Sequence, residues 1–417
     1  MNNRKVAIIL LLIIIFIGAY VSARGGGDFD VYLQAAQRLK KGENIYAPPF
    51  IRNLQYYYSV FFALLIIPFC TNVFITEFIW VATSFILLLR IKKIIEGYFI
   101  IDALSKRQKN TWLILSALLS IQFILYDISM IQITIFLLWA MLESLQLVQK
   151  GRQGYAGILL GIAINIKLMP MLLLPWLFYR GYFTAAITCI LCVVGLLYLP
   201  GVFIGYGLNN FLLHEWWKVI NPSNKENLFE TGIGTHSIVA WLPVYLTPTH
   251  GELPFKRNLF NLQPSTVVLL MNSTRLFLLS LSICFLRTPI FKKEPDKLKL
   301  YWEISYFLLL IPLLFPHQQK YNFLLVCPMV VYLLYFFIRS AHCYPPVSYK
   351  LALVVFIISM TFYSPLYGAD VIGKFLFRYT QHYRFLTFST IFLVPIALYC
   401  NPARLKRIVG GAFFAQA

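Results

Sequence analysis

The chain has few acidic residues: 16 aspartates and glutamates among 417 residues, against 36 lysines and arginines. Charged residues make up only 12% of the sequence, whereas 59% of the residues are hydrophobic. This composition excludes an ordinary soluble globular protein and indicates an all-α protein that crosses a membrane many times. Because no long polar stretch remains to form a soluble domain, we expect a single integral membrane domain over residues 1–417.

The sequence also lacks the patterns of a metal centre, a disulfide framework or a nucleic-acid surface. Its six histidines are scattered, no His-Glu-x-x-His segment occurs, and Asp28-x-Asp30 alone is too short for a calcium loop. The seven cysteines lie mostly in or near apolar runs without paired spacing, which is typical of small core residues. The net charge of +20 is spread over short loops. We therefore expect no metal, no cofactor and no nucleic-acid partner.

The positions of lysine and arginine predict the topology, because cytoplasmic loops of membrane proteins carry an excess of both. Basic residues collect at positions 4–5, 90–109, 150–152, 180, 287–299, 339–350 and 404–407. The outward loops are then residues 23–55, 206–263 and 366–384, with tight turns near residues 126–130 and 316–321. We expect about 11–13 transmembrane helices, from about 20 apolar residues per span.

Three apolar segments need separate treatment. The run from Val6 to Ser22 is interpreted as an uncleaved first span, although its small-residue end also resembles a signal-peptide cleavage site. Residues 56–69 are expected to be short or re-entrant, because the chain must cross an odd number of times before Arg90. Residues 154–180 bend near Lys167, which either extends to lipid headgroups or is a fixed cation for a lipid phosphate.

The first outward loop holds two of the rare acidic residues, Asp28 and Asp30, beside a glycine triplet. Apolar residues recur at helical spacing from Phe29 to Leu39, and Gly42 ends the run. This pattern predicts an amphipathic helix at the membrane interface. Asp28 falls at or next to the N-cap, where its carboxylate either caps the helix or, kept ionised, serves as a base.

The other outward segments contain further polar groups that a reaction on the outer face would use. His236 lies in a stretch rich in glycine and hydroxyl groups, and His317 shares a tight turn with Lys320. Arg378 and Arg384 belong to a basic cluster in the last loop, where the cytoplasmic bias of positive charge would disfavour it. The cluster indicates an anionic partner at the outer surface or a loop that touches acidic lipid headgroups.

Three segments follow one another in the order of motifs of a known family. Residues 28–36 read Asp-Phe-x-Val-Tyr-x-x-Ala-Ala, residues 155–170 run from Tyr-Ala-Gly-Ile-Leu-Leu-Gly into Lys-x-x-Pro, and residues 312–317 form a Pro-x-x-x-x-His turn. In these motifs the chain resembles glycosyltransferase family 87, whose known members include polyprenol-phosphate-mannose-dependent mannosyltransferases. It departs from the family pattern at residues 57–59, where Tyr-Tyr-Ser replaces Tyr-Pro-Pro, and at residues 131–134, where Ile-Gln-Ile-Thr replaces a Gly-Gln-Val-Asn type of sequence.

The resemblance implies the GT-C architecture, an all-helical membrane enzyme whose first outer loop carries an essential carboxylate. The donor would be a polyprenyl-phosphate sugar, with mannose favoured as the hexose, and the acceptor a glycolipid or polysaccharide. By motif match, Asp28 is expected to be the general base of an inverting transfer, with Asp30 as the second choice. We expect the donor phosphate to be bound by Lys167, His317 and Lys320, and the substrates by His236, Arg378, Arg384 and Gln132.

Two other functional classes stay open. A transporter or flippase would place ionisable groups near the bilayer midplane and often has two related halves, whereas here charges lie mainly at span ends and no internal repeat occurs. A polymerase or ligase of polyprenyl-linked glycans would rely on later arginine-rich loops, a role that residues 366–384 could fill. For the favoured enzyme we expect a bacterial inner membrane, with the active site facing the periplasm.

Overall fold

The computed structural model of the chain describes residues 27–230, 232, 234–251, 253–286, 289–341 and 347–414. Helices of α and 3-10 type account for all the regular structure in these ranges, and no β-strand occurs among them. This confirms the predicted all-α class. The apolar run of residues 6–22, and with it the question of a cleaved or uncleaved first span, lies outside the described residues.

Several helices are long and apolar enough to cross a membrane. Within the described ranges five spans satisfy this test: Val73–Glu96, Lys106–Ser129, Phe183–Ile204, Pro264–Leu286 and Lys320–Ser340. A sixth would be formed by Phe385–Tyr399 with Pro402–Gly410, which are bent by 53°. Shorter apolar helices include Val60–Cys70, and its length agrees with the prediction of a short first segment. The protein is therefore polytopic, and the total of about 11–13 spans stays a prediction.

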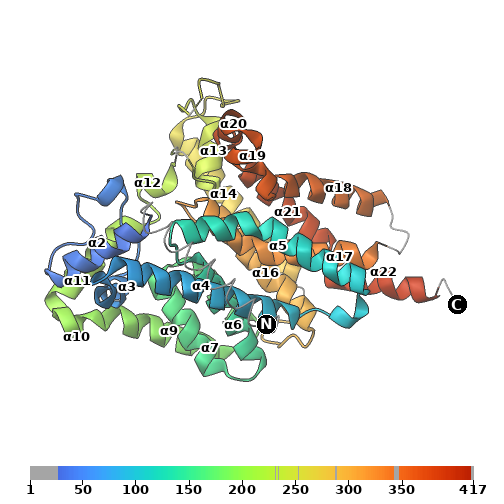
Figure 1. Cartoon of the computed structure of the whole chain (residues 1–417), viewed down its shortest axis with the longest axis horizontal. Helices are drawn as coiled ribbons and strands as arrows, with labels where there is room; N and C mark the ends of the chain where they lie inside the picture. The colour runs from blue at the N-terminus through green and yellow to red at the C-terminus, as the bar shows by residue number, and fades with distance from the viewer. Residues whose placement is uncertain are drawn as a thin grey trace, which may run out of the picture. The chain divides into compact units, whose positions relative to one another are not determined.

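The chain divides into two compact units. The first unit comprises residues 1–94 and 124–224. Its helices are α2 (Phe29–Lys40), α3 (Val60–Ile66), α4 (Val73–Glu96), the last turns of α5 (Lys106–Ser129), α6 (Thr134–Gln149), α7 (Gln153–Ile166), α8 (Leu174–Tyr179), α9 (Phe183–Tyr198), α10 (Pro200–Ile204) and α11 (Tyr206–Ile220) (Figure 1). Short 3-10 turns lie at Ile51–Asn53, Ile67–Cys70 and Met169–Leu173.

Helix α2 is the helix predicted for the first outward loop. It ends in a Schellman motif, in which Gly42 has φ +74° and its N–H donates to Leu39, while the N–H of Glu43 donates to Arg38. Phe29 and Leu39 on its apolar face are 0% and 1% exposed, and the helix packs on α3 and the following 3-10 turn. The amphipathic helix is thus confirmed, and protein covers its apolar face, while its place at the membrane interface stays a prediction.

Helix α7 contains the glycine-rich motif of residues 155–161 and packs closely on α9. A Cβ atom on Gly157 would lie 2.4 Å from the carbonyl oxygen of Ala185, and one on Gly161 would lie 2.7 Å from Cβ of Cys192. The two glycines are four residues apart and therefore share one helix face, as in closely packed membrane helices. The motif thus sets the position of the C-terminal end of α7, which Lys167 follows directly.

The two ends of α6 carry different polar groups. Near its C-terminal end, Arg90 of α4 forms two hydrogen bonds of 2.7 Å with Glu143, and it also donates to Gln146. Asp127 and Gln132 precede the N-terminal end at Thr134, which lies about 14 Å along the helix axis from Glu143. Residues predicted to face the cytoplasm and residues predicted to face outward therefore gather at opposite ends of α6.

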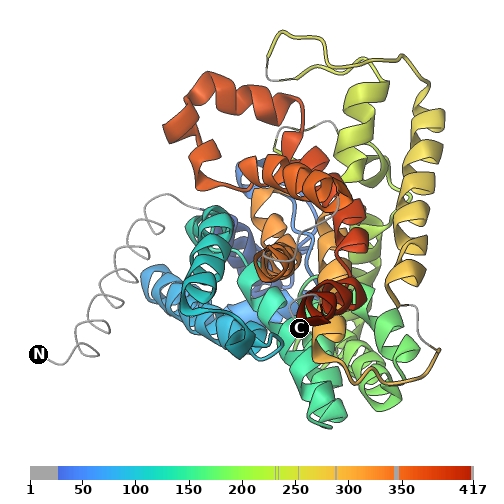
Figure 2. The same cartoon turned by 90° about the vertical axis from the view of Figure 1, so that its right-hand side faces the viewer.

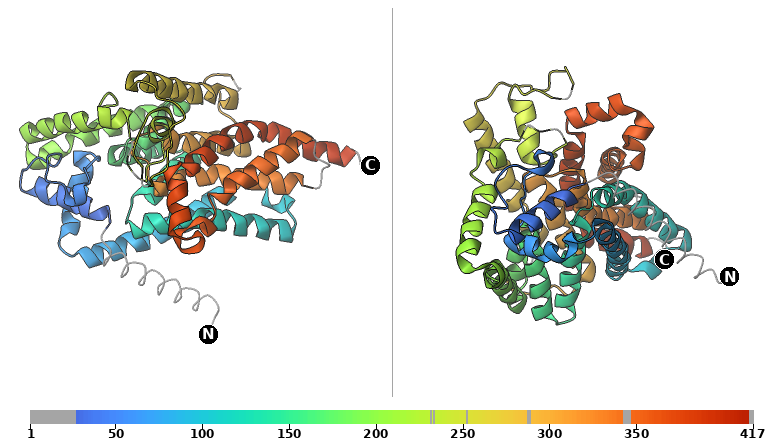
Figure 3. Two further views of the ribbon diagram at one scale, coloured as in Figure 1. Left: turned by 90° about the horizontal axis from the view of Figure 1, so that it is seen from above. Right: turned by 60° about the vertical axis from the view of Figure 1, so that its left-hand side comes forward.

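The second unit comprises residues 95–123 and 225–417. Its helices are most of α5, α12 (Lys225–Leu228), α13 (Ile238–Leu246), α14 (Pro264–Ser280), α15 (Ser282–Leu286), α16 (Lys297–Leu314), α17 (Cys327–Ser340), α18 (Val347–Thr361), α19 (Ala369–Ile372), α20 (Lys374–His382), α21 (Phe385–Tyr399) and α22 (Pro402–Phe414). Helix α16 is buried along almost its whole length and contacts α17, α21 and α22. Helices α13 and α14 lie side by side (Figure 2), and α22 runs beside α17 (Figure 3). Further 3-10 turns lie at Ile101–Ala103, Lys320–Val326 and Pro365–Tyr367.

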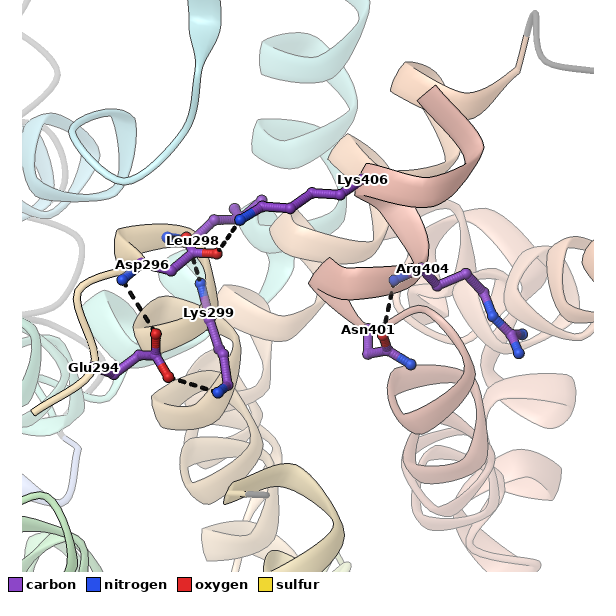
Figure 4. Close-up of polar contacts among 7 residues, drawn as sticks. All are labelled: Glu294, Asp296, Leu298, Lys299, Asn401, Arg404 and Lys406. Carbon is purple, nitrogen blue, oxygen red and sulfur yellow. Dashed lines mark hydrogen bonds and ion pairs between the residues drawn. The ribbon is translucent and has the colours of Figure 1, made fainter. Parts of the chain in front are cut away.

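Two segments of the second unit that were predicted to be cytoplasmic meet at the start of α16 (Figure 4). Asp296 caps this helix by accepting hydrogen bonds from the N–H groups of Leu298 and Lys299, at 3.0 and 3.4 Å. Its other carboxylate oxygen pairs with Lys406 of α22 at 2.8 Å, and Glu294 pairs with Lys299 at 2.5 Å. This contact agrees with the prediction that residues 287–299 and 404–407 share one side of the membrane.

Candidate functional site

Asp28 is the N-cap residue of α2, but among the described residues its side chain makes no capping hydrogen bond to the helix. Its Oδ2 atom instead accepts a hydrogen bond from Nε2 of Gln132, which lies 104 positions later in the chain. The side chain is partly buried. The sequence left two roles open for Asp28, and the structure removes the capping role.

Just before Asp28, the backbone of Gly27 lies in close contact with the backbone of Met130. A Cβ atom on Gly27 would lie 2.6 Å from the carbonyl oxygen of Met130, a distance that real Cβ atoms do not show. Only glycine fits here without a shift of the backbone. The last glycine of the triplet therefore allows the first loop to pack against the turn that presents Gln132.

Gln132 belongs to a buried network of side chains. Its Oε1 atom accepts a hydrogen bond of 2.9 Å from the hydroxyl of Tyr32, and that hydroxyl lies 2.8 Å from the hydroxyl of Tyr58. The indole N–H of Trp80 donates to the backbone carbonyl of Gln132 at 3.0 Å. Burial raises the pKa of Tyr58, and the charges of Asp28 and Asp127 raise it further, so this hydroxyl stays protonated. The glutamine expected to bind substrate thus also holds the candidate base.

Lys167 lies next to these groups, in an extended conformation just after α7. Its Nζ atom is 5.5 Å from the centre of the Tyr58 ring, within the range of a cation–π contact. Burial lowers the pKa of Lys167 to about 8, while the negative charges of Asp28 and Asp127 act to raise it. A buried lysine beside an aromatic ring, under the electrostatic influence of two carboxyl groups, fits the prediction of a fixed cation better than that of a side chain extending to lipid headgroups.

Asp127 is a third charged member of this group. It lies in the last turn of α5 and is 1% exposed, close to the N-terminus of α6, where the amides of Thr134 and Ile135 are among its neighbours. The positive end of a helix dipole stabilises a carboxylate. Together Asp28, Asp127 and Lys167 bring two carboxyl groups and one ammonium group into one cluster of the first unit.

Asp30, the second candidate base, lies elsewhere on α2. Its Oδ2 atom is 3.0 Å from the guanidinium of Arg52, and the two side chains are 26% and 49% exposed. Two positions along a helix turn a side chain well away from its neighbour, which agrees with Asp30 as the second choice for the base. Asp30 contributes to the surface of the first loop.

In the second unit, His317 makes polar contacts through its backbone N–H and through both ring nitrogens. Glu230 accepts a hydrogen bond of 3.1 Å from the backbone N–H of His317, and its other oxygen lies 2.8 Å from ring atom Nδ1. Ring atom Nε2 is 2.8 Å from the side-chain oxygen of Asn227. His317 has a φ of +56°, which is uncommon for a residue with a side chain, and the bonds to Glu230 stabilise this conformation.

His236 and Arg384 form a second group in the same unit. They are 1% and 2% exposed; the backbone N–H of His236 donates to the carbonyl of Gln318 at 2.8 Å, and Arg384 donates to the carbonyl of Gly232. Burial lowers the pKa of His236 to about 3, and the charges of Arg384 and Lys320 act in the same direction. The imidazole is therefore neutral at physiological pH, in a region of positive charge.

The remaining candidates lie on or near α20. The Nζ atom of Lys320 is 5.5 Å from the ring centre of Phe377, and Arg378 is exposed on the same helix. Thr380 and His382 are buried, and His382 bonds to the loop of residues 247–263. The basic cluster of the last loop thus divides into a buried part and an exposed part.

Four of these functional candidates were not singled out from the sequence: Tyr32, Tyr58, Asn227 and Glu230. Tyr32 is part of the first motif, and Tyr58 lies at a departure from the family pattern, so both had a signal that pointed to them. Glu230 had the same signal as Asp28, since it is one of only 16 acidic residues and lies in a predicted outward segment. Asn227 had none.

Comparison with known families agrees with this fold. No curated protein and no solved structure gives a significant match. The model of glycosyltransferase family 87 matches residues 56–312, more than half of the chain, and this range includes Tyr58, Asp127, Gln132 and Lys167. The GT-C architecture is consistent with that family and with the all-helical membrane fold. The chain belongs to glycosyltransferase family 87 and is a membrane glycosyltransferase.

Proposed function

We propose that the protein transfers a hexose, with mannose favoured by the family resemblance, from a polyprenyl-phosphate sugar to a hydroxyl of a glycolipid or glycan. The location that we propose is the outer face of a bacterial inner membrane. The observation that carries the proposal is that Asp28, which does not cap its helix among the described residues, shares one cluster with Lys167. An inverting transfer from a lipid phosphate needs such a carboxylate and such a cation.

The mechanism follows from the charges of these two residues. The carboxylate of Asp28 accepts the proton of the acceptor hydroxyl while the oxygen attacks the anomeric carbon. The bond between that carbon and the phosphate oxygen breaks on the opposite face of the sugar, and its electron pair leaves with the polyprenyl phosphate. Lys167 stabilises the negative charge that develops on the phosphate. At the anomeric carbon one bond forms and one breaks, and the proton of the acceptor hydroxyl moves to Asp28.

An outward location is supported by how the candidate residues gather within the first unit. In the first unit Asp28, Asp127 and Lys167 lie near the N-terminal end of α6, whereas the ion pair of Arg90 and Glu143 lies toward its other end. Positive charge is expected at the cytoplasmic ends of spans. The catalytic cluster is therefore proposed to open on the side opposite to Arg90.

The second unit contains further residues that are candidates for substrate contacts. Lys320 and His317 are candidates for the donor phosphate, and binding through His317 would require its Nε2 atom to exchange Asn227 for a phosphate oxygen. Buried His236 and Arg384, with exposed Arg378, are candidates for sugar or acceptor contacts. A neutral imidazole with a buried guanidinium is a suitable donor and acceptor pair for sugar hydroxyls.

The test is sugar transfer by the purified protein in nanodiscs, from a panel of radiolabelled polyprenyl-phosphate sugars to native lipid extract. Asp28→Asn and Asp30→Asn keep the shape of the side chain and remove the base. We expect transfer from one donor, abolished by Asp28→Asn and largely kept by Asp30→Asn. Full activity in both variants, or transfer only from diphosphate-linked glycans, would overturn the proposal, and the latter result would favour a polymerase or ligase.

A further inference from the structure

We propose that Tyr32 and Tyr58 are positioning residues that act through Gln132 to orient Asp28 for proton abstraction. This inference rests on the proposed function, in which Asp28 is the base. It assigns to two tyrosines and a glutamine a role that the family match does not give them. Four side chains from three separate segments of the first unit form the relay: the N-terminal end of α2, the residues before α3 and the turn before α6.

The relay has a direction, which follows from the hydrogen-bonding capacity of each group. An ionised carboxylate only accepts, so Gln132 must direct its NH2 group toward Asp28, and its amide oxygen then faces the tyrosines. The hydroxyl of Tyr32 donates to that oxygen at 2.9 Å, and the hydroxyl of Tyr58 lies 2.8 Å from that of Tyr32 and 3.4 Å from the same amide oxygen, so Tyr58 donates to one of the two. Every donor in the chain therefore points toward Asp28.

Packing fixes the members of the relay in place. Tyr32 and Gln132 are 0% and 1% exposed, and the ring of Tyr32 meets those of Tyr58 and Phe62 edge to face, with centroids 4.9 and 5.1 Å apart. The bond from Trp80 to the backbone of Gln132 fixes the start of its side chain. Because each group is buried, water cannot replace a lost partner, and removal of one hydroxyl leaves the amide of Gln132 less well oriented.

The neighbouring Tyr56 shows how a tyrosine hydroxyl with a purely structural role is hydrogen-bonded in this part of the protein. Tyr56 is 2% exposed, its ring centroid is 5.5 Å from that of Tyr58, and its hydroxyl donates to the backbone carbonyl of Ser59 at 3.0 Å. That bond ends on the main chain and does not continue toward Asp28. Tyr56→Phe is therefore a matched control for the loss of a buried tyrosine hydroxyl.

The experiment measures kcat and KM across pH for Tyr32→Phe, Tyr58→Phe, Gln132→Met and Tyr56→Phe, with Asp28→Asn in parallel. We expect kcat of Tyr32→Phe to fall about tenfold with little change in KM. This loss of kcat is smaller than the roughly 100-fold loss that misplacement of a catalytic group can cause. Tyr58→Phe should lose less, since the Tyr58 hydroxyl is 3.4 Å from the amide oxygen of Gln132, farther than that of Tyr32 at 2.9 Å. In Gln132→Met the ionised base loses a hydrogen bond, so the acidic limb of the pH profile should move to higher pH.

A double variant separates positioning from stability. If Tyr32 acts through Gln132, Tyr32→Phe causes no further loss of kcat in a Gln132→Met background, whereas independent effects would multiply. The relay is refuted if Tyr32→Phe behaves like Tyr56→Phe, or if the losses multiply, while Asp28→Asn is inactive. If Asp28→Asn keeps full activity, the proposed base itself is wrong, so the two failures are distinguishable. Thermal unfolding of each variant shows whether a loss of kcat follows from misfolding.

Discussion

The ammonium group of Lys167 lies over the ring of Tyr58, 5.5 Å from its centre. This contact joins the end of α7 to the segment that precedes α3, and the hydroxyl of the same Tyr58 continues toward Asp28 through Tyr32 and Gln132. One tyrosine thus touches both the candidate phosphate cation and the relay to the candidate base. The two charges that the proposed reaction needs are held by one aromatic cluster in the first unit.

Removal of the charge of Lys167 should impair transfer strongly. In Lys167→Met the stem is kept and the cation is lost, so we expect kcat/KM for the lipid donor to fall about 100-fold or more, as when one group that stabilises a developing oxyanion is removed. Lys167→Arg should keep part of the activity. Lys41→Met, at an exposed lysine just after α2, is the control. An unchanged kcat/KM in Lys167→Met would exclude this lysine from the phosphate site.

The pH dependence of donor binding should follow from the same lysine. Burial lowers the pKa of Lys167 to about 8, so the cation is present below this pH and is lost as the pH rises through it. We therefore expect kcat/KM for the donor to fall on the alkaline side with an apparent pKa near 8. Lys167→Arg should move this fall to a higher pH, since arginine stays protonated. The same alkaline limb in both proteins would assign the titration to another group.

The sequence pointed to two charged members of the candidate site, Asp28 and Lys167, for specific reasons. Asp28 and Lys167 stood out because charges are rare in this chain and both lie near predicted outward turns. Tyr32 and Tyr58 did not, since tyrosine is common here and a hydrogen bond between segments 26 or 100 positions apart has no local pattern. The sequence also could not predict that protein packs on the apolar face of α2, because apolar residues that face lipid and those that face protein have the same composition.

Replacement of Gly157 should show that the glycine motif serves helix packing. In Gly157→Ala the new Cβ atom would lie 2.4 Å from the carbonyl oxygen of Ala185, so α7 and α9 must separate. We expect a loss of about 1–3 kcal/mol in the free energy of unfolding, as for other overpacked sites, seen as a lower thermal midpoint. Gly154→Ala, in the same helix, has no described neighbour within 4 Å and should be neutral or slightly stabilising. Equal midpoints for the two variants would contradict this role.

The hold of Glu230 on His317 should be visible in both stability and kinetics. Glu230 binds the backbone N–H and the ring of His317 with its two oxygens, and Glu230→Gln keeps only one acceptor. Because the Glu230 side chain is 9% exposed, the lost bond should cost about 1–3 kcal/mol of unfolding free energy. The control is Glu215→Gln, which breaks an ion pair with the 58% exposed Lys218, and such surface pairs contribute little.

The kinetic effect of Glu230→Gln separates the two roles that His317 can have. If His317 binds the donor phosphate, a ring that is no longer held should raise KM for the donor while KM for the acceptor is unchanged. If the contact with Glu230 and Asn227 only ties the α12 segment to the turn before the Lys320–Val326 helix, stability falls and both KM values stay the same.

Asn227→Leu removes the partner of Nε2 and leaves Glu230 in place. If His317 binds the phosphate, its Nε2 atom no longer has to give up Asn227, and the donor should bind more tightly. Weaker donor binding in this variant would contradict the proposed exchange.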